Sequence, residues 1–222
     1  SGLLLIALGA VALFAAALGL HTQSAAVKGF STFLPSEETV AYFEVKDGLN
    51  EEIRTLLAQK LGRNWKQEEF NWTQGKAGVA LLKKEAENEL LIPYFFFEVS
   101  SRELDKEQAA AFFKNNAGVL NLSLTIINDT LIASTSNENL NYLLAHIQAT
   151  AGTGRLNASR TFIRLQATNK HNYFLYLKPK EVSAAVRTFI ADYIPDMPLL
   201  SLPFSHMGMG FDKEDKKIQG KV

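Results

Sequence analysis

Hydrophobic residues are distributed in two different ways along this chain. Residues 3–20 form an uninterrupted apolar run without a charge, whereas apolar and polar positions are interleaved from residue 34 onward. At about 1.5 Å of rise per residue, a helix over this run spans roughly 27 Å, close to the ~30 Å core of a bilayer. The pattern predicts a transmembrane helix at residues 1–20 and a short polar linker at 21–33. A cleavable signal peptide is the alternative, because residues 23–26 are small or polar, but its apolar region usually has only about 7–15 residues.

The predicted transmembrane helix carries small residues along one side. Lipid tails are as apolar as leucine, so helices associate in a bilayer through close backbone approach, which small residues allow. The pattern therefore predicts a helix contact within the membrane, either with a second copy or with a membrane-protein partner. The residues expected to form it are Gly9, Ala12, Ala15, Ala16 and Gly19.

From residue 34 onward, strand-like and helix-like patterns follow one another. Short apolar or alternating stretches between turn residues predict strands, and apolar residues three or four apart predict helices. The clearest hairpin turns at Asn128 and Asp129, residue types that tolerate left-handed backbone. The pattern is typical of an α+β domain of antiparallel hairpins and helices. Predicted strands cover 39–46, 78–83, 90–99, 122–127, 130–134, 173–178, 206–211 and 216–222, and predicted helices cover 51–61, 101–115, 137–149, 160–166 and 180–193.

One combination of patterns occurs twice. The stretch AYFEVK at 41–46 is followed by a helical pattern containing IRTL, and YFLYLK at 173–178 is followed by a helical pattern containing VRTF. Each unit then leads into a hairpin with a charged tip. This echo predicts a duplicated strand–helix–hairpin module. The first module would cover 34–150 and the second, truncated module 151–222.

Four motifs after the apolar segment occur in an order found in a known family. They are LPSEETVAYFEV at 34–45, GKAGVAL at 75–81, TLIAS at 130–134 and YFLYL at 173–177. With these motifs the chain resembles the bacterial family catalogued as domain of unknown function 3352. The resemblance implies a single-pass protein whose domain lies outside the cytoplasmic membrane and has no assigned activity. It carries over no functional residues, because the family has none that can be named, and the motifs are strand and turn patterns rather than catalytic signatures.

Composition excludes several classes of function. The chain of 222 residues has 23 basic and 23 acidic side chains, and it contains no cysteine. Balanced charge without a basic cluster argues against a nucleic-acid partner. Without cysteine there is no disulfide, thiolate chemistry or cysteine-based zinc site.

The usual catalytic signatures are missing from the sequence. It has no Gly-x-Ser-x-Gly elbow, no His-Glu-x-x-His and no Walker loop. The four histidines are scattered, and none has another at metal-ligand spacing. The acidic pair Glu37 and Glu38 is better explained by a strand entrance than by acid–base catalysis. We therefore predict no catalytic, metal or cofactor site, and a protein that is not an enzyme.

The aromatic run at 94–97 allows two interpretations. It is too apolar for a strand with one wet face, so it fits a central strand buried on both faces. Alternatively, Tyr94 and Phe96 could form an aromatic face that docks on a partner.

These observations lead to one main functional hypothesis and one alternative. The main hypothesis is a non-enzymatic, single-pass protein of the cell membrane, with the bilayer and a membrane protein as partners. Its extracytoplasmic domain would serve as a scaffold or accessory subunit of a membrane complex. The alternative is a membrane-anchored module that binds an envelope lipid or glycan between its two halves. A hydrolase of unrecognised type is a third and weaker possibility.

Overall fold

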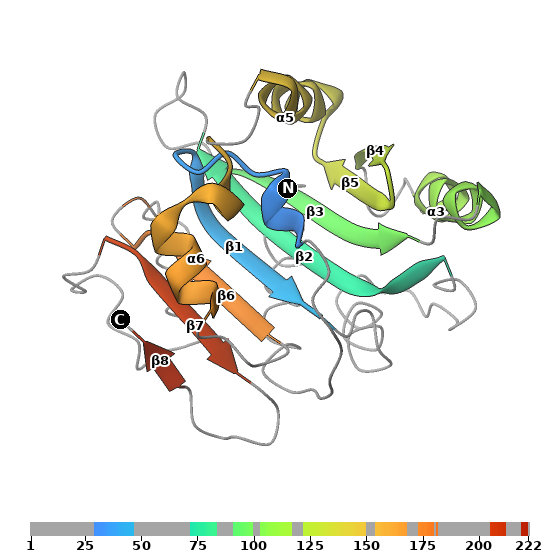
Figure 1. The fold of residues 1–222 in the computed structure, drawn as a ribbon. Helices are drawn as coiled ribbons and strands as arrows, with labels where there is room; N and C mark the ends of the chain where they lie inside the picture. Colours follow the sequence, from blue (N-terminus) through green and yellow to red (C-terminus); the bar gives the residue numbers. More distant parts are fainter. Residues whose placement is uncertain are drawn as a thin grey trace.

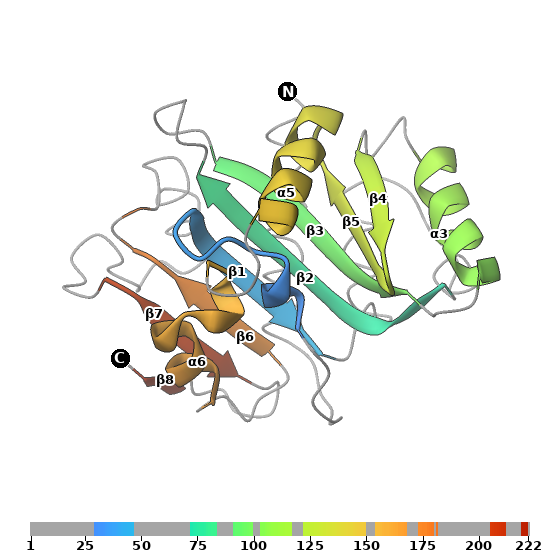
Figure 2. The ribbon, with the colours of Figure 1, turned by 45° about the horizontal axis from the view of Figure 1, so that its top comes forward.

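The structure is a computed structural model, and it describes residues 29–46, 72–83, 91–99, 103–116, 122–149, 154–167, 173–179, 181, 205–211 and 219–221. These residues form one eight-stranded antiparallel sheet in the order β4-β5-β3-β2-β1-β6-β7-β8 (Figures 1 and 2). The strands are β1 (Thr39–Val45), β2 (Thr73–Lys83), β3 (Leu91–Val99), β4 (Ser123–Ile127), β5 (Thr130–Ser134), β6 (Tyr173–Leu177), β7 (Met207–Phe211) and β8 (Gln219–Lys221). The helices are α3 (Glu103–Asn115), α5 (Asn137–Ala149) and α6 (Arg160–Ala167), with 3-10 turns η1 (Phe30–Thr32) and η3 (Leu156–Ala158).

Both faces of the sheet are apolar, and different helices cover them. On one face, called the α3 face here, Phe43 belongs to the same buried cluster as Phe113 of α3. On the other, called the α5/α6 face, Tyr42 shares a buried cluster with Leu140 of α5 and Phe162 of α6. Neighbouring residues of a strand point to opposite faces, and all seven residues of β1 are buried. The sequences of the central strands are therefore nearly continuous apolar runs and do not alternate between apolar and polar residues.

Most of the predicted elements within the described residues are confirmed. The helix predicted at 137–149 coincides with α5, and the Ser136 hydroxyl accepts a hydrogen bond from the Asn139 amide at 3.2 Å as a helix cap. The hairpin of β4 and β5 turns at the predicted residues, and Asn128 adopts the left-handed conformation with φ 54°. The helices predicted at 51–61 and 180–193 lie outside the described residues.

The predicted fold class, a transmembrane helix followed by a duplicated module, is wrong as a description of this structure. The strands expected to open two separate modules pair with each other: β1 and β6 lie side by side, with Phe43 opposite Leu175. Residues from 34–150 and from 151–222 thus share one sheet. The alternation pattern specifies which face a side chain takes, but it does not specify which strand lies alongside.

The described residues include no helix long and apolar enough to cross a membrane. The apolar segment 1–20, together with Gly9, Ala12, Ala15, Ala16 and Gly19, lies outside them. The contact predicted for these five residues therefore stays a prediction.

Candidate functional site

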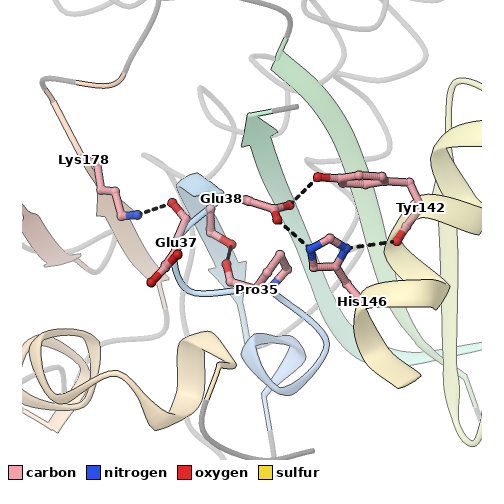
Figure 3. A network of polar contacts seen from close by, with 7 residues as sticks. Pro35, Glu37, Glu38, Tyr142, His146 and Lys178 are labelled. Atoms are coloured by element: carbon pink, nitrogen blue, oxygen red, sulfur yellow. Dashed lines mark hydrogen bonds and ion pairs between the residues drawn. The ribbon is translucent and has the colours of Figure 1, made fainter. Parts of the chain in front are cut away.

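A group of polar side chains that contact one another or the backbone lies around the turn that leads into β1. This turn, residues 35–38, lies beside the face of α5 that carries Tyr142 and His146 and beside the end of β6 (Figure 3). We call its members the 35–38 cluster. The cluster consists of Pro35, Ser36, Glu37, Glu38, Tyr142, His146 and Lys178.

Backbone hydrogen bonds fix the 35–38 turn before any side chain is considered. The amide of Ser36 donates to the carbonyl of Gly154 at 2.8 Å, and the amide of Lys83 donates to the carbonyl of Glu38 at 2.9 Å. The turn is therefore attached both to the segment before η3 and to the end of β2. These hydrogen bonds fix the backbone positions from which the side chains of the turn extend.

The Glu38 carboxylate binds two side chains of α5. Tyr142 donates its hydroxyl hydrogen to one carboxylate oxygen at 2.8 Å, and the Nε2 of His146 lies 2.6 Å from the other. Tyr142 and His146 are four residues apart and therefore neighbours on one helix face, with ring centroids 4.8 Å apart. The Nδ1 of His146 lies 3.4 Å from the Tyr142 carbonyl. This arrangement joins α5 to the 35–38 turn at two points (Figure 3).

Lys178 joins the same turn to the end of β6. Its ammonium donates to the carbonyls of Ser36 at 2.9 Å and Glu37 at 2.6 Å, and it lies 3.7 Å from the carboxylate of Glu181. The side chain is buried, and burial lowers the pKa of Lys178 while Glu181, Glu37 and Glu38 oppose that change. The Lys178 amide also donates to the carbonyl of Val40 at 2.8 Å. Side chain and backbone thus attach the end of β6 to the beginning of β1.

Three further groups surround the cluster. Tyr94 donates to the carbonyl of Asn139 at 2.8 Å, and its pKa is raised by burial, with smaller effects from Tyr142 and Glu38. Burial, followed by the charge of Lys178, lowers the pKa of His206. The His206 ring packs 6.0 Å from the ring of Tyr176. Burial therefore favours the neutral forms of Tyr94 and His206.

The composition of the 35–38 cluster includes residue types used in catalysis. A carboxylate beside a histidine can orient a general base, and a lysine with a lowered pKa can act as a nucleophile. Here each of these groups is bound within the protein: His146 faces both Glu38 and a helix carbonyl, and Lys178 faces two carbonyls. The geometry is that of a clamp joining three parts of the chain. Among the described residues, no group of three or more acidic or histidine side chains could hold a metal ion.

A second polar pair lies inside the α5/α6 face. Tyr42 donates its hydroxyl hydrogen to the carboxylate of Glu44, and both side chains are buried. Burial raises the pKa of Tyr42, and the neighbouring charge of Glu44 adds to the effect. A Cβ added at Gly29 would lie 2.7 Å from the Glu44 carboxylate. The backbone of Gly29 therefore lies against the Glu44 carboxylate, and a side chain at this position would force one of them to shift.

The residues predicted as a docking face are inside the protein. Tyr94 and Phe96 are both 0% exposed, and Phe96 stacks on Phe30 of η1 with centroids 5.5 Å apart. The aromatic run belongs to β3, a strand between β2 and β5. The structure therefore agrees with the interpretation of a central buried strand, and neither side chain is exposed to a partner.

Sequence reasoning missed the 35–38 cluster. Two weak signals were present: adjacent carboxylates at a strand entrance, and a tyrosine and a histidine four residues apart on a predicted helix. Neither signal indicates that these residues meet. Comparison with family models, curated proteins and solved structures finds no match. The resemblance to the family catalogued as domain of unknown function 3352 thus stays a prediction.

Proposed function

We propose that this chain is a non-enzymatic scaffold or accessory subunit of a membrane assembly. The apolar segment 1–20 would hold it at the cell membrane, and the sheet domain would lie outside the cytoplasm. Membrane location rests on the sequence pattern, and the function rests on the arrangement of the polar side chains.

The proposal rests on one observation: the side chains of the 35–38 cluster that could act in catalysis instead hold parts of the fold together. Glu38 binds Tyr142 and His146, and Lys178 binds two backbone carbonyls. Releasing one of these groups for catalysis would remove a side-chain contact that joins α5 or the end of β6 to the turn. Enzymes instead present such groups to a reacting atom within hydrogen-bond reach. A clamp of this kind suits a domain that must keep a fixed surface.

The ligand-binding alternative depends on a space between two modules. Because β1 pairs directly with β6, the halves meet through backbone hydrogen bonds, and no described contact favours a ligand there. We therefore retain the scaffold proposal alone.

The test is gentle detergent extraction from native membranes, followed by size-exclusion chromatography and quantitative mass spectrometry. The proposal predicts a second polypeptide that elutes with this chain at a fixed ratio. Recovery of this chain alone from the membrane fraction, or its recovery outside that fraction, would contradict it.

A further inference from the structure

Among the strands that the structure describes, the sheet ends on one side at β4, and no described strand pairs with the outer edge of β4. β4 pairs only with β5 among the described strands. In a two-residue hairpin the residues next to the turn exchange both hydrogen bonds, and bonded pairs then alternate along the strand. Ile127 and Thr130 are next to the turn. The N–H and C=O groups of Thr125 therefore point to β5, and those of Leu124 and Ile126 point away from the sheet.

The two edges of the sheet differ in how they are protected. Natural edge strands avoid pairing with other chains by being short, or by carrying charge, proline or a bulge. At the opposite edge, β8 has three residues and includes Lys221. β4 has five residues, SLTII, without charge, proline or glycine, and its register with β5 is regular. All five of its side chains are partly exposed.

The helices near β4 cover its faces rather than its edge. Leu124 and Ile126 pack on the cluster that includes Phe113 of α3, and Ile127 packs on the cluster that includes Leu143 of α5. These two clusters lie on opposite faces of the sheet. In Figures 1 and 2, α3 and α5 accordingly lie on either side of the β4–β5 hairpin.

The sequence of β4 is complementary to itself when one copy is reversed. With two strands antiparallel and centred on Thr125, Leu124 of each copy lies opposite Ile126 of the other. All the outward N–H and C=O groups of these two residues then find partners. If one copy of β4 shifted by one residue, backbone N–H and C=O groups that point out of one sheet would face residues whose groups point into the other sheet. The hydrogen bonds between the two copies would then be lost. The same register places leucine and isoleucine together on the α3 face, and Thr125 opposite its own copy.

We propose that two copies of this chain pair through their β4 edges, antiparallel about a two-fold axis at Thr125. The occupant of the edge is a second copy, because the strand matches itself in hydrogen bonding, in apolar pairs and in register. A two-fold interface of this kind uses the same surface on both subunits and closes after two copies. The proposal goes beyond the scaffold function and does not depend on it.

The proposed register predicts which residues of the two β4 strands lie opposite each other, and cross-linking can test this prediction. The chain contains no cysteine, so each single substitution introduces the sole thiol. Residues opposite each other in a non-hydrogen-bonded antiparallel pair have Cα atoms about 4.5 Å apart, within the range of a disulfide. Thr125→Cys should cross-link to a dimer under mild oxidation. Ser123→Cys is the matched control on the same strand and face, because its two copies would be separated by about four residues at ~3.4 Å each, or ~14 Å.

The expected result is efficient dimer formation by Thr125→Cys in the full chain in detergent, with little by Ser123→Cys. Equal cross-linking of both variants, or of neither, would overturn the proposal. An association of the apolar segments alone would give dimers in sedimentation without selective cross-linking, and would therefore also count against it.

A charge-swap experiment tests the same pairing without cysteine, so the proposal can still be tested if a cysteine variant misfolds. Thr125→Lys and Thr125→Glu each place like charges opposite one another, which is destabilising. Each variant alone should sediment as a monomer, and an equimolar mixture should restore the dimer. Thr161→Lys, in an exposed position of α6, should leave the dimer unchanged. An unmodified chain that is itself monomeric, or a mixture of the two variants that stays monomeric, would overturn the proposal.

Discussion

Replacing Lys178 by methionine tests how much the clamp between β6 and the 35–38 turn contributes to stability. Methionine keeps most of the buried apolar stem and removes the ammonium. Two backbone carbonyls, those of Ser36 and Glu37, then lose donors that lie at 2.9 and 2.6 Å. We expect Lys178→Met to lower the free energy of unfolding without changing the sheet.

The magnitude follows from the contacts. A hydrogen bond to a charged group contributes about 1.5–3 kcal/mol. The ion pair with Glu181 adds at most about 1 kcal/mol, because that partner is 40% exposed. The cost of burying the ammonium, seen in the lowered pKa of Lys178, offsets part of this sum. We expect a net loss of about 2–4 kcal/mol.

The assay is urea unfolding of the full chain in detergent, followed by tryptophan fluorescence. With a slope of about 1–3 kcal/mol per molar urea, the midpoint should fall by about 1 M or more. Lys83→Met is the matched control, since Lys83 also ends a strand but has an exposed side chain. Equal midpoints for the two variants would refute the reasoning, because it assigns the effect to the buried hydrogen bonds of Lys178.

Three further predictions concern the cluster and the core. Tyr142→Phe removes the hydroxyl bound to Glu38 and should cost about 1 kcal/mol in urea unfolding; a stabilised variant would contradict the role of this bond. Gly78→Ala should cost about 1–3 kcal/mol by overpacking, since its Cβ would lie 2.8 Å from the Phe30 ring, and unchanged stability would show that the ring moves aside. Because burial lowers the pKa of Lys178 below its ordinary 10.5, the unfolded chain binds more protons at this side chain between the lowered pKa and 10.5. The stability difference between the unmodified chain and Lys178→Met should therefore rise with pH across that window, and a difference that falls would refute the assignment.

The sequence predicted local structure better than it predicted contacts between distant elements. The helix α5 could be identified from Asn137 onward because Leu140 and Leu143 repeat at helical spacing. The hairpin of β4 and β5 could be identified from its turn residues. In both cases the decisive interactions lie within a few residues.

The pairing of β1 with β6 and the 35–38 cluster could not be predicted in this way. Both strands are mostly apolar and are buried on both faces, so several partners would satisfy their patterns equally well. Glu38 and Tyr142 are 104 positions apart, and nothing in either local pattern indicates the other. The echo between 41–46 and 173–178 singled out two strands that meet, but it suggested separate modules instead of adjacent strands.

The central claim is that the two halves of the chain form one sheet, joined at β1 and β6 and held by the 35–38 cluster. Amide hydrogen exchange read by mass spectrometry tests it most directly, with the unmodified chain and Lys178→Met compared in the same detergent. The account predicts that peptides covering β1 and β6 exchange slowly and together, and that Lys178→Met speeds exchange in both. Independent exchange of the two strands, or faster exchange confined to β6, would contradict it.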